Sequence, residues 1–366
     1  MNKLVVGNIL YRPVRSAISV LAVAIEVIMI LSIVAIMIGQ VQGAANQTGG
    51  VGADIIVRPP NASFLSAVGG APVPARVAQV LAKLPHVAVA APVIANFNMG
   101  NALQTVWGID YPSYEALRPF AFVAGGPFQG PDDVLVDDLY ARSTHSQVGG
   151  TLRLLNHDFR VCGIVEHGKG GRIFVPIGTL GTLLGTPDNA SLFYIRSDSS
   201  DHQDLIAQEI HAAPGLQQYQ VQTMQEYMSM MTPEHFPGFN IALRVVISIA
   251  VIVGFLVIFQ SMYTAVMERT REIGILKSLG ASKVYVLNLV LREATMVAIA
   301  GIIVGILATE ALRFGMAAKF PTLPFLISME WRIYGAIIAL VGSILGALYP
   351  AFKAASKDPI DALAYE

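Results

Sequence analysis

The sequence predicts a membrane α-helical protein with four transmembrane helices and a large extracytoplasmic α+β domain inserted between the first and the second. Of the 366 residues, 54% are hydrophobic and only 13% are charged, a composition typical of membrane proteins. A membrane-spanning helix needs about 20 apolar residues, because it must cross about 30 Å of hydrocarbon. Four stretches meet this requirement: residues 16–39, 241–266, 286–312 and 332–352.

Positively charged residues predict the orientation of these helices. Lys and Arg concentrate in residues 1–15, in the loop 267–285 and in residues 353–366, whereas residues 313–331 contain few of them. Because short cytoplasmic segments carry an excess of Lys and Arg, we expect both termini and the 267–285 loop in the cytoplasm. We therefore expect a multi-pass protein of the cell inner (cytoplasmic) membrane, with residues 40–240 on the periplasmic or extracellular side.

The first apolar stretch is expected to remain in the protein as an uncleaved anchor. It is longer than the roughly 7 to 15 apolar residues of a secretory signal peptide. No convincing cleavage site follows it. The chain therefore should keep all four membrane spans.

Residues 40–240 are numerous enough to form a folded domain with its own core. Short strand-like apolar runs separated by Gly, Pro and Asp fill most of this stretch, with helical spacing near both ends. We expect a membrane-proximal α+β lobe from residues 50–105 and 190–238, and an outer β-rich lobe from residues 106–189. The single cysteine, Cys162, lies in an apolar strand pattern and is interpreted as a small buried hydrophobe, in preference to a reactive thiol.

Charge also distinguishes residues 40–240 from the rest of the chain. The predicted domain has ten Lys and Arg against sixteen Asp and Glu, whereas the rest of the chain has fourteen against nine. The basic part suits the anionic cytoplasmic leaflet, so we expect contacts with membrane lipid. The acidic domain gives no reason to expect nucleic acid as a partner.

The loop between the second and third spans has the charge pattern of a short amphipathic helix. It reads MERTREIGILKSLG from residue 267. Glu268 stands three residues before Arg271, and Arg269 three residues before Glu272, so each pair can lie on one helical face. The pattern predicts a charged helix between two membrane spans.

The apolar residues of the same helix predict a contact surface. Ile273, Leu276 and Leu279 would form a narrow apolar ridge, and Gly280 suits a left-handed helix end. A ridge bounded by charges can seat in a groove on a soluble partner. The alternative is an ordinary juxtamembrane turn that basic residues hold against lipid headgroups.

Three features together resemble the FtsX-like, MacB-type permease family of ABC transporters, which has the type VII ABC fold. The first is ERTREIGILKSLG at residues 268–280, and the second is the tail YPAFKAASKDPIDALAYE at residues 349–366. The third is the order of one span, a large external domain and three further spans. The external stretches VWGIDY (106–111), FRVCGIV (159–165) and FVP (174–176) are also similar to the family. In layout the chain is nearest to haem exporters and adaptor-linked, DevC-like permeases.

This resemblance implies a permease subunit that works as a homodimer with a cytoplasmic ABC ATPase, and a periplasmic adaptor protein is a further possible partner. The sequence has no G-x-x-x-x-G-K-[ST] phosphate loop, so we expect it not to be an enzyme and the ATPase to be a separate subunit. ATP and Mg would be used by that subunit, this chain would bind no cofactor, and haem is a possible cargo. Ala364 stands where many family members have Arg, which puts an ion pair there in doubt. The resemblance assigns ATPase coupling to Glu268, Arg271, Glu272, Ile273, Gly274, Leu276, Lys277 and Gly280.

Polar residues in the membrane spans are candidates for substrate binding or gating. Glu26 lies near the middle of the first span, where a charge costs roughly 2.5 to 3.5 kcal/mol. It could contact substrate, act in gating or form a buried hydrogen bond with a neighbouring span. Arg244 lies near an outer end, where it could contact substrate but more simply reaches the interface.

The methionines and histidines include candidate ligands for haem or a metal ion. Met228 and Met231 lie beside Tyr227 just before the second span, and soft packing is the simplest interpretation. They could also line the entrance for an apolar ligand or contribute a haem ligand. The seven histidines show no metal-binding spacing such as H-E-x-x-H, so we expect no metal site.

The preferred function is extrusion of a hydrophobic or amphiphilic cargo, such as haem, a lipid, a drug or a peptide, through mechanotransmission. The near absence of ionisable residues in the spans favours such a cargo over a small ion. One alternative is an FtsX-like signalling permease that activates an external cell-wall hydrolase without transport. The other is a membrane-anchored receptor without an ATPase.

Overall fold

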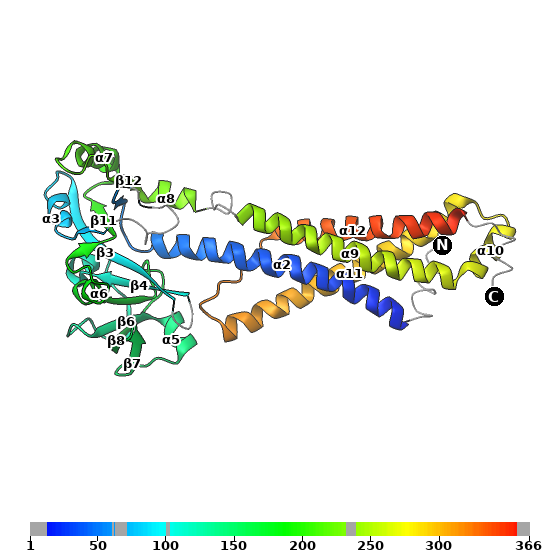
Figure 1. Ribbon diagram of the computed structural model, residues 1–366, viewed down its shortest axis with the longest axis horizontal. Coiled ribbons are helices and arrows are strands. Elements are labelled where there is room, and N and C mark those ends of the chain that lie inside the picture. Colours follow the sequence, from blue (N-terminus) through cyan, green and yellow to red (C-terminus); the bar gives the residue numbers. More distant parts are fainter. Residues whose placement is uncertain (1–12, 61, 63–71, 100–102, 232–238, 357–366) are drawn as a thin grey trace. The chain divides into compact units, whose positions relative to one another are not determined.

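The computed structural model describes residues 13–60, 62, 72–99, 103–231 and 239–356 (Figure 1). The chain forms two compact units. The helical unit comprises Met1–Gly39, Pro237–Ala318 and Phe325–Glu366, and the sheet unit comprises Gln40–Phe236 and Lys319–Pro324. Predictions about residues 1–12 and 357–366, including Ala364, lie outside the described residues.

Four long helices build the helical unit together with a short one. Each of the long helices is long and apolar enough to cross a membrane, and each contains one of the spans predicted from the sequence. Large apolar side chains such as Ile25, Ile252 and Leu307 point outward, as expected for surfaces that face lipid. The predicted fold class is therefore confirmed. The helices are α2 (Pro13–Gly49), α9 (Phe239–Glu268), α10 (Thr270–Ser278), α11 (Lys283–Lys319) and α12 (Met329–Ser356).

All four long helices exceed the predicted spans, and α2 and α11 extend furthest beyond them. α2 continues ten residues beyond residue 39 to Gly49, and α11 continues beyond residue 312 to Lys319. Polar residues and a single glycine do not end a helix, and the first proline after α11 is Pro321. The predicted external loop 313–331 is therefore corrected to the shorter connection between α11 and α12.

Small residues allow the long helices to pack closely. A Cβ atom on Gly301 would lie 2.6 Å from Val23, and one on Gly305 would lie 2.8 Å from Val27, so α11 packs directly on α2. A Cβ atom on Gly346 of α12 would lie 2.8 Å from a backbone oxygen of α9. These glycines serve packing, as their small-xxx-small spacing predicts.

The sheet unit is built around one ten-stranded sheet in the order β12-β1-β11-β3-β4-β9-β6-β8-β5, with β7 paired to β8. β4 pairs in parallel with β9 and β6 with β8, and the other pairs are antiparallel. A second sheet joins β2 and β10. The strands are β1 (Ile55–Arg58), β2 (Val73–Pro74), β3 (Val87–Met99), β4 (Leu103–Ile109), β5 (Phe122–Gly125), β6 (Asp133–Asp137), β7 (Thr151–Leu154), β8 (His157–Val165), β9 (Ile173–Pro176), β10 (Asn189–Ala190), β11 (Leu192–Ser197) and β12 (Gln220–Thr223).

The two predicted lobes are two halves of this one sheet. Residues 50–105 and 190–238 supply β12, β1, β11 and β3, whereas residues 106–189 supply β9, β6, β8, β5 and β7. The division into separate lobes is corrected because β3 and β4 pair along their length across the predicted boundary. The sheet therefore has no break there.

Alternating side chains explain why the halves looked separate in sequence. On one face of the sheet, Ile55 and Val57 belong to one core and Val134 and Val136 to another. On the opposite face, residues from both halves share a single core that includes Tyr194. Because apolar side chains leave both faces of each strand, helices must cover both. They are α3 (Val77–Leu81), α4 (Tyr111–Leu117), α5 (Asp138–Thr144), α6 (Ile177–Leu183), α7 (Gln203–Ala212) and α8 (Met224–Met230), with a 3-10 turn at Ser200–His202.

Cys162 lies in β8 and has the environment of a packing residue. Its thiol donates to the backbone oxygen of Val134 at 3.4 Å, and its side chain packs against the shared core. Burial raises the pKa of Cys162 to about 12. The reactive thiolate is therefore scarce at neutral pH, which supports the interpretation as a small hydrophobe.

The loop 168–172 connects three segments of the sheet unit. The Gly170 N–H donates to the backbone oxygen of Gln47 at 2.8 Å. The Arg172 guanidinium donates to Asp137 Oδ2 at 2.9 Å and to the backbone oxygen of Thr322 at 3.2 Å. Gln47 belongs to α2 and Thr322 to the α11–α12 loop, so this loop fastens both of these segments to the sheet.

Lys169 lies in the same loop and is buried. Its ammonium donates to the backbone oxygen of Arg118 and lies 4.9 Å from the centre of the Phe120 ring. Its own backbone oxygen accepts from the Tyr114 hydroxyl at 2.5 Å. Burial lowers the pKa of Lys169 to about 8, although Glu115 opposes this shift.

Replacing Lys169 with Met should stabilise the protein at pH 7. Between about pH 8 and 10.5 the unfolded chain keeps the Lys169 proton that the folded protein has released, so stability should rise with pH in that window. Below about pH 8 Lys169 is protonated in the folded protein as well, so the full cost of burying its charge lowers the stability. We expect Lys169→Met to raise the free energy of unfolding by about 1–2 kcal/mol at pH 7 and to flatten the rise above pH 8.

Thermal unfolding of the full chain in detergent, followed by intrinsic fluorescence across this pH range, checks the prediction. Lys83→Met is the matched control, because Lys83 is exposed. An unchanged or lower midpoint for Lys169→Met would show that the ammonium stabilises its site.

Candidate coupling site

α10 begins and ends with features that separate it from the spans on either side. Arg269, at φ −109° and ψ 16°, interrupts the helix between α9 and α10. At the other end, the Ala281 N–H donates to the Leu276 oxygen and the Gly280 N–H to the Lys277 oxygen, both at 3.0 Å. Gly280 has φ +97°, so this is a Schellman motif of the kind that its glycine predicts.

One side of α10 is attached to the neighbouring helices. Arg269 forms an ion pair with Glu293 of α11 at 3.0 Å, and their side chains are only 12% and 8% exposed. Lys277 Nζ donates to the backbone oxygen of Ala355, near the end of α12, at 3.0 Å. Ile273 is buried in the core of the helical unit. Movement of α10 must therefore act on α11 and α12. Figure 1 shows α10 beside the ends of α9 and α12.

The predicted apolar ridge is corrected. Ile273 points into the core and Leu276 is half-buried, so neither forms an exposed ridge with Leu279. The exposed apolar residues of α10 and its end are Ile275, 45% exposed, and Leu279, 80% exposed. These two stand four residues apart and so share a helical face. The sequence pattern predicted a different set of exposed residues, Ile273, Leu276 and Leu279.

The other residues predicted to couple to the ATPase differ in their exposure. Glu268, Arg271 and Glu272 are exposed, and Gly274 is buried. The pairing expected for Arg269 was with Glu272, but its ion pair is with Glu293, far along the chain. The i,i+3 pattern could not reveal a contact between two different helices.

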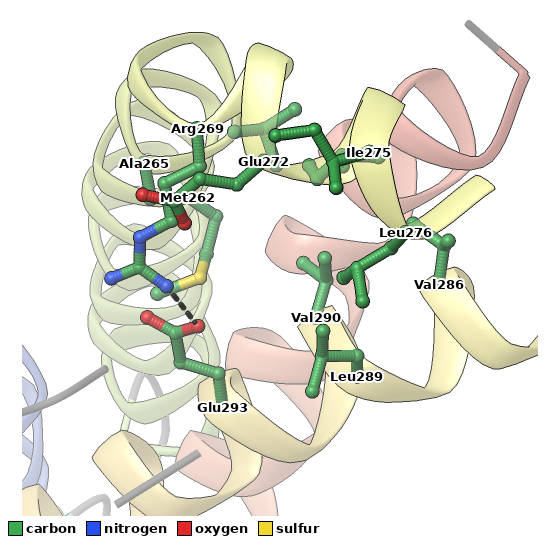
Figure 2. A pocket seen from close by; sticks show the side chains of 12 residues that line it. Met262, Ala265, Arg269, Glu272, Ile275, Leu276, Val286, Leu289, Val290 and Glu293 are labelled. Carbon is green, nitrogen blue, oxygen red and sulfur yellow. Dashed lines mark hydrogen bonds and ion pairs between the residues drawn. The ribbon is translucent and has the colours of Figure 1, made fainter. Parts of the chain in front are cut away.

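A cavity of about 320 Å³ lies beneath α10. Figure 2 shows Leu276 pointing toward Leu289 and Val290 of α11, with the Arg269–Glu293 pair at another side of the space. Residues of α9, α10 and α11 line it: Met262, Ala265, Val266, Arg269, Glu272, Ile273, Ile275, Leu276, Val286, Leu289, Val290 and Glu293. Space on this side leaves room for α10 to move against α11.

Comparison with known proteins decides the family. The MacB-like periplasmic core domain family matches residues 16–213, which is more than half of the chain. The chain belongs to this family of ABC transporter permeases. The FtsX-like permease C-terminal family matches residues 244–359, a range that contains α10. The permease is thus a membrane component of an ABC transporter with an extracytoplasmic domain.

The relatives of the permease are similar over parts of the chain. The uncharacterized ABC transporter permease YvrN of Bacillus subtilis is 31% identical over 47% of this chain and 44% of its own length. The macrolide export ATP-binding/permease protein MacB of Rhodopirellula baltica is 30% identical over 47% of this chain and 26% of its own. The chain therefore spans less than half the length of these curated relatives. The crystal structure of the periplasmic region of MacB from Actinobacillus actinomycetemcomitans aligns with 50% of this chain and 94% of its own, at 13% identity and a TM-score of 0.41.

Glu26 of the permease is buried between three helices. It is 2% exposed, and neither carboxyl oxygen has a hydrogen-bond partner among the described residues. A Cβ atom on Gly254 of α9 would lie 1.9 Å from Glu26 Oε2, and one on Gly342 of α12 would lie 3.7 Å from Oε1. The carboxyl group occupies space that these glycines leave open. The expected hydrogen bond to a neighbouring span is not found in the described part of the chain.

The other residues predicted to contact substrate, Arg244, Met228 and Met231, are distant from Glu26 in the sequence. Arg244 is exposed on α9. Met228 and Met231 are half-buried and pack against the core shared by both halves of the sheet. Met228 is also 3.0 Å from the position of a Cβ atom on Gly49. These contacts favour packing for both methionines, and their role in substrate binding stays a prediction.

A histidine cluster was missed in the sequence. His86, Asp198 and His202 have donor atoms within 4.8 Å of one another. His86 lies far along the chain from Asp198 and His202, which are four residues apart, so spacing could not reveal the cluster. Only the pairing of β3 with β11 brings the three residues together.

Proposed function

We propose that this permease couples ATP hydrolysis by a separate cytoplasmic ATPase subunit to the extrusion of a hydrophobic or amphiphilic cargo. Haem, a lipid, a drug and a peptide are the candidate cargoes. Two copies of the permease would assemble with two ATPase subunits, which bind the ATP and Mg used in the export cycle. Membrane lipid and a periplasmic adaptor protein are further expected partners.

The observation that carries this proposal is the division of α10 into two faces. Arg269, Ile273 and Lys277 attach one face to the helical unit. On the other face Leu279 is 80% exposed, and Ile275, which also lines the cavity, is 45% exposed. An exposed apolar pair surrounded by charges suits docking in the groove of a soluble protein. A force applied by that protein would reach α11 and α12 through the attached face.

Contacts in the sheet unit support the proposed transmission of movement from the membrane helices to the extracytoplasmic sheet. α2 is one continuous helix from Pro13 to Gly49, and its last turns are held to the 168–172 loop through Gln47. Arg172 holds the α11–α12 loop to the same strand end through Thr322. Movement of two membrane helices would therefore act on the extracytoplasmic sheet at one place, without a charged channel through the membrane.

A deletion strain separates export from hydrolase control. Loss of an exporter should cause sensitivity to toxic apolar compounds, and plasmid-borne permease should restore resistance. A division or cell-wall defect without any sensitivity would instead favour the signalling permease. Absence of a copurifying ATPase would favour the receptor.

Arg172→Ala tests the link between the membrane helices and the sheet. We expect export to fall by roughly tenfold, within the range of measured couplings between distant sites, while ATP turnover changes little. The reason is that Arg172 holds Thr322 but lies outside the ATPase-contacting region.

Export of a fluorescent cargo and ATP turnover should be measured in the same vesicles. Arg153→Ala is the matched control, because Arg153 is an exposed residue of the same sheet unit whose partners are the nearby Asn156 and Asp158. Equal export by both variants would mean that Arg172 does not transmit movement.

A further inference from the structure

The histidine cluster is built by the pairing of two strands. His86 directly precedes β3 and Asp198 directly follows β11, and these strands pair so that Val87 stands opposite Ser197. The Asp198 N–H donates to the His86 oxygen at 2.9 Å, which fixes the two backbones to each other. His202 follows one turn later, in the 3-10 turn that Ser199 caps. The main chain therefore sets the positions of all three side chains.

The three side chains converge on one point. Asp198 Oδ2 lies 3.2 Å from His86 Nδ1, and Asp198 Oδ1 lies 2.8 Å from His202 Nδ1. The centres of the two imidazole rings are 4.0 Å apart. Ligand atoms about 2.0–2.1 Å from a tetrahedral Zn²⁺ stand roughly 3.3 Å from one another. The Asp198–His86 and Asp198–His202 distances are close to this spacing, and the three side chains are partly exposed.

His86 adopts a backbone conformation that directs its ring into the cluster. Its φ of +65° is in the left-handed region, which is uncommon for residues other than glycine. The hydrogen bond to Asp198 holds this conformation.

We propose that His86, Asp198 and His202 bind a divalent transition-metal ion, with Zn²⁺ as the best match. Two imidazoles and one carboxylate suit Zn²⁺, Ni²⁺ or Cu²⁺, whereas Ca²⁺ and Mg²⁺ require mainly oxygen ligands. Three protein ligands leave a fourth position for water or an external ligand. Binding joins the β3–β11 end of the sheet to the start of α7. The site is independent of the export function.

Metal binding by the full chain tests this proposal. The protein should be purified in detergent with a tag that lacks histidine, stripped with a chelator, and titrated with Zn²⁺ by calorimetry and with Co²⁺ by visible absorption. We expect one ion per chain, and a higher thermal midpoint when Zn²⁺ is present. His202→Ala should weaken Zn²⁺ binding at least tenfold and abolish the increase in midpoint.

His211→Ala is the matched control, because His211 lies on α7 and contacts the backbone oxygen of Gln217. It should bind Zn²⁺ as the unaltered protein does. His202→Ala should keep the midpoint of the metal-free protein, which separates loss of binding from loss of folding. Binding that is absent in the unaltered protein, or equal in His202→Ala, would overturn the proposal.

Discussion

Leu279→Asp should disrupt binding of the ATPase subunit while leaving the permease folded. Leu279 is 80% exposed, so a carboxylate at this position remains in water and costs the fold little. In the complex the same carboxylate would be buried in an apolar groove without a partner. Burying a charged group without a partner costs at least about 2 kcal/mol, so we expect affinity to fall roughly thirtyfold. Cargo-stimulated ATP turnover should be lost with it.

The measurement is the affinity of purified ATPase for the permease in lipid nanodiscs, together with turnover. Val148→Asp is the control, because Val148 is an exposed apolar residue of the sheet unit. Leu276→Asp is a weaker probe, since Leu276 lines the cavity and its replacement would also disturb packing. Unchanged affinity for Leu279→Asp would exclude the exposed face of α10 as the docking surface.

Arg269→Ala should both destabilise the helical unit and uncouple turnover from export. Arg269 and Glu293 are almost completely buried, so removal of either one breaks a buried ion pair. Breaking a buried ion pair costs about 3–5 kcal/mol. Because this pair joins α10 to α11, its loss also removes a polar attachment through which α10 acts on the spans.

Thermal unfolding in nanodiscs measures the first effect, and the ratio of export to ATP hydrolysis measures the second. Arg313→Ala is the matched control, since its i,i+3 contact with Glu310 at 3.5 Å is more exposed and should be worth less than about 1 kcal/mol. Replacing both Arg269 and Glu293 with Met should restore much of the stability. The account of the pair is wrong if Arg269→Ala and Arg313→Ala unfold at the same temperature.

Membrane spans and most strands could be predicted because local apolar pattern determines them. β4 is one of the short apolar runs expected to be strands, and α8 lies near the end of residues 40–240, where helical spacing was expected; Thr223 and Glu226 form a capping box there. α4 lies in the stretch 106–189, which we expected to be rich in β-strands. Pro112 stands directly after the cap Asp110 and Tyr111, which is a favourable helix start.

Contacts between distant segments could not be predicted. The Arg269–Glu293 pair joins two helices, the Arg172 contacts join a strand to a loop, and the histidine cluster joins the ends of two strands. None of these leaves a fixed spacing in the sequence. The predicted exposed face of α10 contained Ile273 and Leu276, whereas Ile275 and Leu279 are the exposed apolar residues. Periodicity identifies the apolar residues of a helix, but it does not show which of them the neighbouring helices cover.

Site-specific photo-crosslinking in living cells tests the central claim most directly. A photoreactive amino acid at position 279 should capture an ATP-hydrolysing subunit, and the same amino acid at position 148 should capture none. This result would show that α10 lies in the cytoplasm against the ATPase while the sheet unit lies outside. Capture of the ATPase from position 148, or its absence at position 279 while the transporter is active, would contradict the account.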